Sequence, residues 1–457
     1  MSALNPRVDG AAAPAIDPRA TMADVTAHAS DLVLERPAGR TWLICFAIAL
    51  LLTGLLAAGI WRLLLKGVGI WGLNIPAAWA FAITNYVWWI AIGMGGTFIS
   101  AGLYLTRQDW RSGLNRFAES MTVCAVSVSG IFPILHLGRP WFFYWLMPYP
   151  NRMGVWPQWR SSLLWDFFAI VAYLLVSLMY WYVGLIPDLA TLRDRARPRW
   201  KQVTYGLFAL GWRGDAGHWA RYERLSLVLA GLSVPLVFSV HSMVALDFSE
   251  GLLPGWHSTL FPPFFIAGAL FSGFAMALVL GIPLRRWYRL EAYITERHLD
   301  NLARLMLAAG LVVGYSYATE LFTAFYSMDR FEIAEAKDRL FGAYAWMFWL
   351  IVGCNVVSIQ ALWSPRVRRN RTALMVIGIL VLIGMWFERL LLILNSLYHG
   401  ALPSSWGMFY PTMWDLAFLA GSVGLFFLLL LILLRWVPML SMFELRKLIH
   451  ARGGAVR

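Results

Sequence analysis

Ten stretches of the chain are long and apolar enough to cross a membrane as helices. A helix needs about 20 mainly apolar residues to span the hydrocarbon core of a bilayer. Apolar residues in these stretches recur at helical spacing or run on uninterrupted, which disfavours a β-barrel. The sequence therefore predicts an all-α, polytopic membrane protein whose transmembrane helices cover 41–65, 79–105, 117–137, 162–186, 225–246, 264–283, 302–326, 342–363, 373–397 and 413–434.

The composition excludes most other classes of protein. Of the 457 residues, 60% are hydrophobic and 14% are charged, whereas soluble domains carry about 25% charged residues. A soluble enzyme, a disordered chain and a disulfide scaffold are therefore excluded. The three cysteines, Cys45, Cys124 and Cys354, lie in apolar stretches without CxxC spacing, which argues against disulfides, zinc and an internal iron–sulfur cluster.

The basic residues predict the orientation of the helices. An even number of spans places both termini on one side. That side carries 29 of the 38 Lys and Arg residues, and the opposite loops carry 8. Because Lys and Arg accumulate in cytoplasmic loops, both termini are predicted to be cytoplasmic. This asymmetry accounts for most of the net charge of +13 without a nucleic-acid partner.

The ends of the chain are predicted to be polar tails around a single membrane domain. Residues 1–39 contain several prolines and no apolar run before a cleavage site, so they resemble a cytoplasmic tail rather than a signal peptide. Residues 40–457 form the membrane domain, of which 435–457 are a C-terminal cytoplasmic tail. The longest inner loop, 187–224, is predicted to be solvated and close to lipid headgroups.

A weak internal similarity predicts a repeat. The second span contains Ile90-Ala91-Ile92-Gly93, and the sixth contains Ile266-Ala267-Gly268. Each is followed by a basic inner loop. We therefore expect two parallel four-helix bundles, helices two to five (79–246) and six to nine (264–397), with helices one and ten as additions.

Ionisable residues inside apolar spans are costly and are functional candidates by default. With the predicted orientation they lie almost entirely toward the outer face, and Glu119 is the exception at an inner end. A structural role remains open for helix-end carboxylates and for a lone histidine. The outer group comprises His136, Asp166, His241, Glu320, Glu388, Arg389 and Asp415, with Asp247 just past the fifth span.

This group suits the chemistry of a quinol, which releases two protons as it gives up two electrons. Carboxylates and imidazoles in apolar surroundings are suited to accept such protons. His136 and Asp166 flank an aromatic loop, 139–145, which can roof an apolar pocket. His241 and Asp247 are six residues apart, so within one continuous helix their side chains would point to different faces. Both can belong to one site only if the fifth helix has ended before Asp247.

Two alternatives compete with quinol chemistry. A cytochrome b needs histidine ligands on facing helices, and only His136 and His241 of the eight histidines lie within spans. Two stacked haems would need four such histidines and are excluded, so the alternative that remains is a single outer haem. A secondary transporter is also disfavoured, because the charges lie near one face and Pro235 has no counterpart in the ninth span. Without haem, flavin motif or cluster cysteines, the chain requires an electron-accepting partner subunit.

Several motifs in order carry a family resemblance from Trp71 to Glu444. The chain resembles the NrfD/PsrC family of quinone-interacting membrane subunits, and within it the ActC subunits of bacterial alternative complex III. The motifs are Gly72-Leu73-Asn74, Ile83-Thr84-Asn85, Phe132-Pro133, His136-Leu137-Gly138-Arg139-Pro140-Trp141, Pro148-Tyr149-Pro150-Asn151, Leu164-Trp165-Asp166, Ser239-Val240-His241-Ser242, Pro254-Gly255-Trp256-His257, Phe261-Pro262-Pro263 and Gly384-Met385-Trp386-Phe387-Glu388-Arg389.

The resemblance implies a haem-free subunit of the bacterial inner membrane that has no complete activity alone. Such a subunit binds menaquinol or ubiquinol, oxidises it near the outer face as part of a quinol:cytochrome c oxidoreductase, and releases protons outward. The implied partners are an outer iron–sulfur protein, multihaem and monohaem cytochromes c, a second NrfD-like subunit and an attached cytochrome c oxidase. The alternative is a quinone-reducing membrane anchor of a molybdopterin and iron–sulfur reductase.

The resemblance also implies roles for individual residues. Relatives commonly have a histidine where this chain has Met94, so no role is assigned there, and no metal, haem, flavin or iron–sulfur cluster is expected in the chain. The implied catalytic residues are His136, Asp166 and Asp247; the implied quinol-binding residues add His241 and Arg139; the implied proton path comprises Glu320, Glu388, Arg389 and Glu119.

Overall fold

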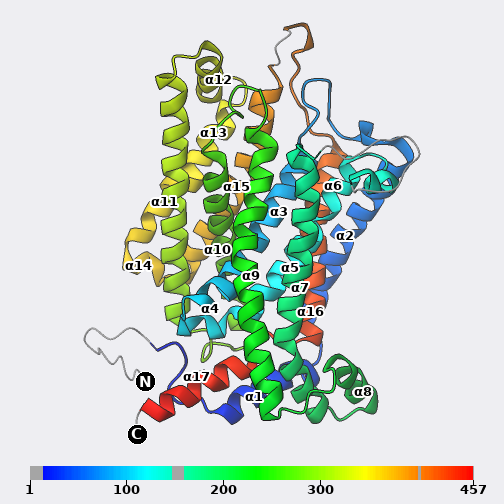
Figure 1. The fold of residues 1–457 in the computed structure, drawn as a ribbon, viewed down its shortest axis with the longest axis vertical. Coiled ribbons are helices and arrows are strands. Elements are labelled where there is room, and N and C mark those ends of the chain that lie inside the picture. Colours follow the sequence, from blue (N-terminus) through cyan, green and yellow to red (C-terminus); the bar gives the residue numbers. More distant parts are fainter. Residues whose placement is uncertain (1–13, 147–158, 400–402, 456–457) are drawn as a thin grey trace.

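A computed structural model describes residues 14–146, 159–399 and 403–455, and these residues form helices and loops without a strand. Ten of the helical segments in this part of the chain are long and apolar enough to cross a membrane, as predicted (Figure 1). They are α2 (Arg40–Lys66), α3 to α4 (Phe81–Leu105), α5 to α6 (Asn115–His136), α7 (Ser162–Arg195), α9 (Ala216–Ser249), α10 (Phe261–Trp287), α11 (Glu296–Tyr326), α13 to η6 (Ala345–Trp363), α15 (Arg371–Leu397) and α16 (Met413–Trp436).

Shorter elements interrupt or connect these spans. Within the spans lie η2 (Phe98–Gly102), α6 (Ile131–His136), η5 (Val352–Val357) and η6 (Ser358–Trp363). Between the spans lie η1 (Val68–Ile70), η3 (Asp109–Gly113), η4 (Pro140–Leu146), α8 (Arg199–Phe208), α12 (Arg330–Phe341), α14 (Pro365–Arg368) and η7 (Pro403–Ser405).

Two spans extend well beyond their apolar stretches. Helix α7 continues through Pro187 to Arg195, and α9 begins at Ala216, so much of the loop predicted over 187–224 is helical. Hydropathy marks only the part of a helix that lies in hydrocarbon, whereas polar turns can continue into water. Helix α9 also runs to Ser249, so the expectation that it ends before Asp247 is wrong.

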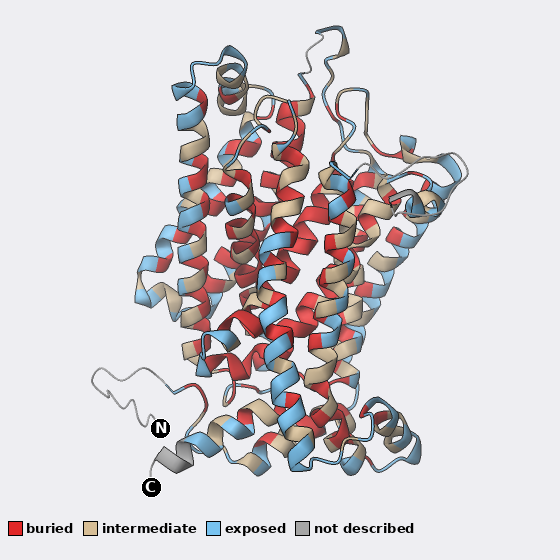
Figure 2. Cartoon of the chain, in the orientation of Figure 1, coloured by how far each residue is buried: buried red, intermediate tan, exposed pale blue. Residues whose placement is uncertain are grey.

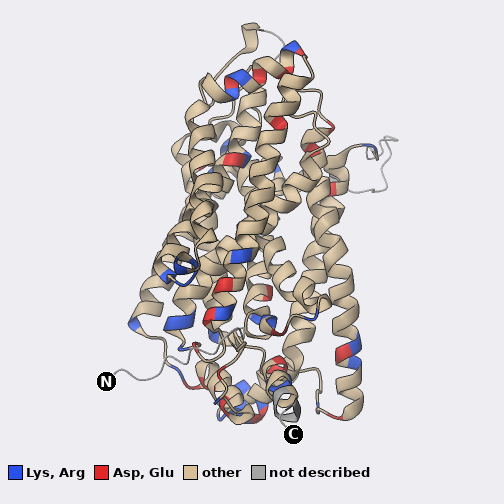
Figure 3. Ribbon diagram, turned by 90° about the vertical axis from the view of Figure 1, so that its left-hand side faces the viewer, with Lys and Arg blue, Asp and Glu red and all other residues tan. Residues whose placement is uncertain are grey.

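The first and the last helix of the chain lie at the same end of the bundle, and Lys and Arg residues gather there (Figures 1 and 3). We call this the termini end and the opposite one the far end. Residues 22–34, predicted as part of a tail, form helix α1 (Met22–Leu34), which Thr21 and Asp24 cap reciprocally. Helix α1 packs against α17 (Met442–Ala455), so the two predicted tails cover the termini end together.

The spans pack side by side, and we name the two predicted groups of four, α3, α5, α7 and α9, and α10, α11, α13 and α15, the two four-helix sets, which contact each other through α10. Helices α3, α5, α7 and α9 contact one another, as do α10, α11, α13 and α15, while α2 packs along α16. Buried residues concentrate in the interior of the bundle (Figure 2), where α3 contacts α10. A side chain on Gly95 or Gly273 would overlap the other glycine, since a Cβ on Gly273 would lie 2.2 Å from the Gly95 Cα. Two glycines therefore set the close crossing of the central helices.

Candidate functional site

A buried carboxylate and a tyrosine hydroxyl form the centre of the candidate site at the far end. Asp166 lies near the start of α7, and Tyr86 lies in the second turn of α3. The Tyr86 hydroxyl donates to Oδ2 of Asp166 at 2.6 Å. The other oxygen, Oδ1, is buried and has no hydrogen-bond partner among the described residues. Because buried polar atoms are nearly always paired, this oxygen is available to a ligand.

A second carboxylate faces the first from α9. Asp247 is close enough to Asp166 for the two to interact electrostatically, and its Oδ1 also has no partner within the described residues. Repulsion between two carboxylates in apolar surroundings is relieved when one of them takes a proton. Asp166 and Asp247 together can therefore accept a proton from a bound molecule.

The third predicted residue, His136, stands among aromatic rings at the end of α6. Its imidazole stacks on Trp71 with ring centroids 6.3 Å apart, and it meets the edge of Trp79 at 6.4 Å. Trp79 in turn packs on Phe248, the residue after Asp247, at 5.9 Å. Ring contacts through Trp79 thus connect His136 to α9, and its Nδ1 has no partner among the described residues.

The loop after His136 contributes aromatic rings, and its described residues show no contact of the Arg139 guanidinium. Arg139 is exposed, and its predicted role in binding quinol stays a prediction. The aromatic segment that follows begins as η4, where Trp141 and Phe142 pack at 6.2 Å. The motif Pro148–Asn151 lies outside the described residues. The described part of this loop therefore continues from His136 with aromatic side chains that pack on one another.

Asp415 has a structural role that accounts for its burial. Its carboxylate accepts hydrogen bonds from the backbone N–H groups of Gly72, at 2.9 Å, and Thr412, at 2.8 Å. The Thr412 hydroxyl completes a capping box at the start of α16. Asp415 joins α16 to the loop after α2 and belongs to the framework rather than to the site.

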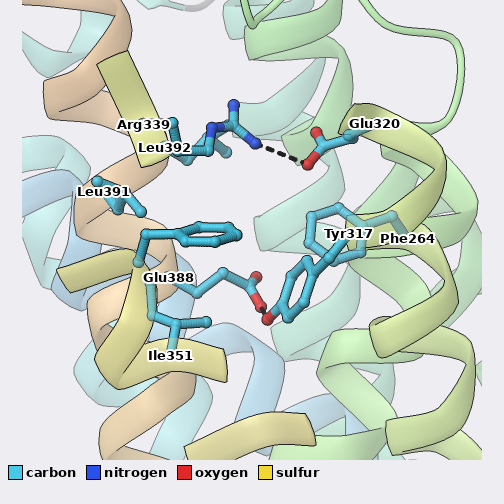
Figure 4. A pocket seen from close by; sticks show the side chains of 9 residues that line it. Phe264, Tyr317, Glu320, Arg339, Ile351, Glu388, Leu391 and Leu392 are labelled. Atoms are coloured by element: carbon cyan, nitrogen blue, oxygen red, sulfur yellow. Dashed lines mark hydrogen bonds and ion pairs between the residues drawn. The ribbon is translucent and has the colours of Figure 1, made fainter. Parts of the chain in front are cut away.

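A second polar cluster surrounds a small cavity in the other four-helix set (Figure 4). Glu320 of α11 pairs with Arg339 of α12 at 2.9 Å, and Arg339 also pairs with Glu335 at 3.0 Å. Below them the Tyr317 hydroxyl donates to Glu388. The cavity measures about 30 Å³, which is room for water molecules but not for a quinone ring.

The charge of Arg339 is secured by its two acidic neighbours. Burial lowers the pKa of the Arg339 guanidinium, but the attraction of Glu335 and Glu320 outweighs it and holds that pKa above its ordinary value. Sequence reasoning missed Arg339 and Tyr317. Arg339 lies on a short polar helix outside the spans, and a tyrosine in an apolar helix gives no signal of its own.

Arg389 and His241 lie where the two four-helix sets meet. Arg389 is 3.0 Å from Glu388 and covers the Phe265 ring at 3.9 Å. His241 packs against the same ring at 6.2 Å, and neither of its nitrogens has a partner among the described residues. His241 and Asp247 therefore point to different neighbours along α9, so the structure groups His241 with Arg389.

Glu119 belongs to a separate cluster at the termini end. The buried Arg116 binds Glu119 at 3.0 Å and Asp188 at 3.1 Å, and it also donates to the Gly184 carbonyl. This cluster joins α5 to α7. The four residues of the predicted proton path are thus divided between two clusters, with Glu119 apart from Glu320, Glu388 and Arg389.

Together these features define a polytopic helical membrane protein with paired carboxylates beside aromatic rings at the end opposite its termini. The chain belongs to the family described as polysulphide reductase, NrfD, which it matches over residues 71–400. The resemblance inferred from its motifs is confirmed at the level of the family.

Two relatives span nearly the whole chain. One, from Halobacterium salinarum, carries the provisional name of a dimethyl sulfoxide reductase membrane subunit and is 25% identical over 91% of this chain and 95% of its own length. Another, from Mesobacillus selenatarsenatis, is named as a subunit of selenate reductase and is 21% identical over 85% of this chain and 92% of its own length. Both names describe one subunit of a reductase.

Proposed function

We propose that this chain is the quinone-binding membrane subunit of a multisubunit respiratory oxidoreductase and that it oxidises quinol at its far end. The observation that carries the proposal is the Tyr86–Asp166 pair, whose second carboxylate oxygen is buried without a partner among the described residues and whose charge interacts with that of Asp247. Quinols are apolar molecules with two hydroxyl groups, and they need proton acceptors of this kind at both ends of the ring.

The residues divide the reaction between proton transfer and orientation. Oxidation of a quinol to a quinone releases two protons and two electrons. Oδ1 of Asp166 accepts the proton of one hydroxyl while Tyr86 holds the other carboxylate oxygen, and Asp247 receives that proton in turn. His136 accepts from the second hydroxyl. The two electrons leave for a redox group held by a partner subunit, since this chain offers no residue pattern for one.

The direction of proton release follows from the predicted orientation. The far end is opposite the basic termini end (Figure 3), and the bias of Lys and Arg toward the cytoplasm makes the far end the outer one. Protons taken by Asp166 and Asp247 are therefore released outside the inner membrane. Quinol oxidation at this site would contribute to the proton gradient even without a path across the membrane.

The first candidate for the complex that contains this chain is a terminal reductase. Both relatives are named as subunits of reductases, which favours the membrane-anchor alternative over a quinol:cytochrome c complex. A reductase consumes electrons, so its membrane subunit would oxidise quinol rather than reduce quinone. The proposed partners are then an iron–sulfur subunit and a molybdopterin catalytic subunit.

A second candidate is the ActC position of alternative complex III. The ordered motifs from Gly72 to Arg389, including His136–Trp141, favour this assignment. The partners would then be an iron–sulfur protein, cytochromes c and a second NrfD-like subunit. The quinol chemistry at Asp166 is the same in both complexes.

A proton path through the second four-helix set is a further part of the proposal. Tyr317, Glu388, Glu320 and Arg339 line the cavity of about 30 Å³, and Arg389 continues the polar surface toward His241. Water in this cavity would connect the two carboxylates. Glu119 would require a separate connection, because it is held by Arg116.

Purification through an affinity tag on the chain tests these assignments. The complex is extracted from native membranes with a mild detergent, its subunits are identified by mass spectrometry, and quinol oxidation is measured. A molybdopterin subunit would support the reductase, and a multihaem cytochrome c would support alternative complex III. A chain that purifies without redox subunits and transports a solute would overturn the proposal.

A further inference from the structure

A cavity at the termini end has the shape and charge of a site for a lipid headgroup. It measures about 220 Å³ and lies between the α1–α2 junction and the last residues of α10 and α16. This is below the roughly 300–1,000 Å³ of a small-molecule site, which fits a headgroup whose acyl chains lie outside. Its lining residues include Leu32, Arg36, Trp42, Trp287, Leu434 and Arg435.

Two arginines line this cavity without a carboxylate partner among the described residues. Arg36 donates to the carbonyl of Trp287 at 2.9 Å and lies over the Tyr288 ring at 4.8 Å. Arg435 donates to the carbonyl of Arg36. The nearby Glu35 is directed toward Arg197, at 3.8 Å. The positive charge of the cavity is therefore not neutralised by the described part of the chain.

Two more deeply buried arginines at the same end do have carboxylate partners. Arg111 pairs with Glu444 at 2.8 Å, and Arg285 pairs with Glu296 at 3.0 Å. Trp42 also lines the cavity, and its Nε1 is buried without a partner in the described residues. Two arginine side chains and a tryptophan with an unpartnered N–H line one cavity, and such a set of donors suits a phosphate group, which accepts several charge-assisted hydrogen bonds.

The surroundings identify the source of the phosphate as a membrane lipid. Three spans begin or end at the cavity: α2 begins at Arg40, α10 ends at Trp287 and α16 ends at Trp436. Tryptophans and arginines at this depth are typical of the membrane interface. Helix α2 also exposes an apolar surface, including Leu43 at 51% and Ile44 at 60%, along which acyl chains can lie.

We propose that this cavity binds the phosphate of an anionic phospholipid of the cytoplasmic leaflet and that the lipid fastens α1 and α2 to α10 and α16. Basic pockets between transmembrane helices on the cytoplasmic side are known to bind such headgroups. The site lies at the opposite end of the molecule from Asp166, so its role is structural and independent of the quinol chemistry.

Titration with short-chain phosphatidylglycerol tests the proposal. The complex is purified through the tagged chain, delipidated by detergent exchange and heated, and the chain that remains soluble is quantified by immunoblot. In the double variant Arg36→Gln/Arg435→Gln, we expect the half-maximal lipid concentration for stabilisation to rise about tenfold or more. The control Arg286→Gln/Arg366→Gln removes two exposed arginines from the same end and should respond like the wild type.

Other arms distinguish the ligand and guard against misfolding. Inorganic phosphate and phosphatidylcholine should stabilise the wild type far less than phosphatidylglycerol. If the double variant does not accumulate, Trp42→Phe removes one donor but keeps the ring and should weaken the response about threefold. A wild-type response to phosphatidylglycerol in the double variant would overturn the proposal. If the double variant does not accumulate, a wild-type response in Trp42→Phe would overturn it. Full stabilisation of the wild type by inorganic phosphate or phosphatidylcholine would also overturn it.

Discussion

Asp166 presents its two carboxylate oxygens to different surroundings. One is fixed by the Tyr86 hydroxyl, and the other is buried without a partner in the part of the chain that the structure describes, so it can meet a ligand. Sequence reasoning could find Asp166, because a carboxylate in an apolar stretch is conspicuous. It could not find Tyr86, because only the folded arrangement of the helices brings this phenol of α3 to the carboxylate of α7. The relation between the two residues is a property of the fold.

Replacement of Tyr86 tests whether this hydrogen bond orients Asp166. We expect Tyr86→Phe to lower quinol turnover about tenfold and to cost about 1–3 kcal/mol of stability, since a buried acceptor loses its donor. Steady-state kcat and KM of the purified complex measure the first effect, and thermal unfolding measures the second. Tyr315→Phe, which alters an exposed tyrosine of α11, is the control. Unchanged kcat in Tyr86→Phe would remove the tyrosine from the mechanism.

Arg339 tests the second polar cluster in the same way. Removal of one partner from a buried ion pair leaves uncompensated charge and costs about 3–5 kcal/mol. We therefore expect Arg339→Gln to lower the melting temperature of the complex strongly, and Arg330→Gln, on the same helix but without an ion pair among the described residues, to leave it unchanged. Equal melting temperatures for the two variants would show that the ion pairs of Arg339 with Glu320 and Glu335 do not stabilise the complex.

At the scale of helices, apolar length predicted the ten spans but not where they end. The polar turns that lengthen α7 and α9 at the termini end lie outside the hydrocarbon, so hydropathy gives no signal for them. The same limit led to the wrong expectation at Asp247, which lies within α9. The sequence left open whether Asp415 is a functional or a structural residue. Its hydrogen bonds with Gly72 and Thr412 show that it caps α16.

The crossing of α3 and α10 provides a test at this scale. A methyl group at residue 273 would lie 2.2 Å from the Gly95 Cα, so Gly273→Ala must push the two central helices apart. Overpacking of this kind costs about 1–3 kcal/mol or more. We expect Gly273→Ala to reduce the yield of monodisperse protein in size-exclusion chromatography. Gly231→Ala on α9, where a Cβ meets open space, should keep the wild-type yield, and an equal yield for both would contradict the close crossing.

For the whole molecule, the distribution of charge predicts which end faces the cytoplasm. Leu252 is exposed in the far-end loop between α9 and α10, and Arg197 is exposed at the termini end. In a Cys45→Ser background, which removes the one exposed cysteine among the described residues, a membrane-impermeant maleimide should label Leu252→Cys in intact cells. Arg197→Cys should react only after permeabilisation. The reverse pattern would invert the orientation and the proposed direction of proton release.

The central claim is that Asp166 takes a proton from quinol, and the turnover of Asp166→Asn in the assembled complex tests it most directly. Asparagine keeps the shape of the side chain and can still meet the Tyr86 hydroxyl, but it cannot act as the base. We predict that Asp166→Asn lowers the rate of quinol oxidation about 100-fold or more while the subunits still assemble. The control Asp109→Asn alters an exposed carboxylate at the termini end and should be as active as the wild type. Wild-type turnover in Asp166→Asn would contradict the account.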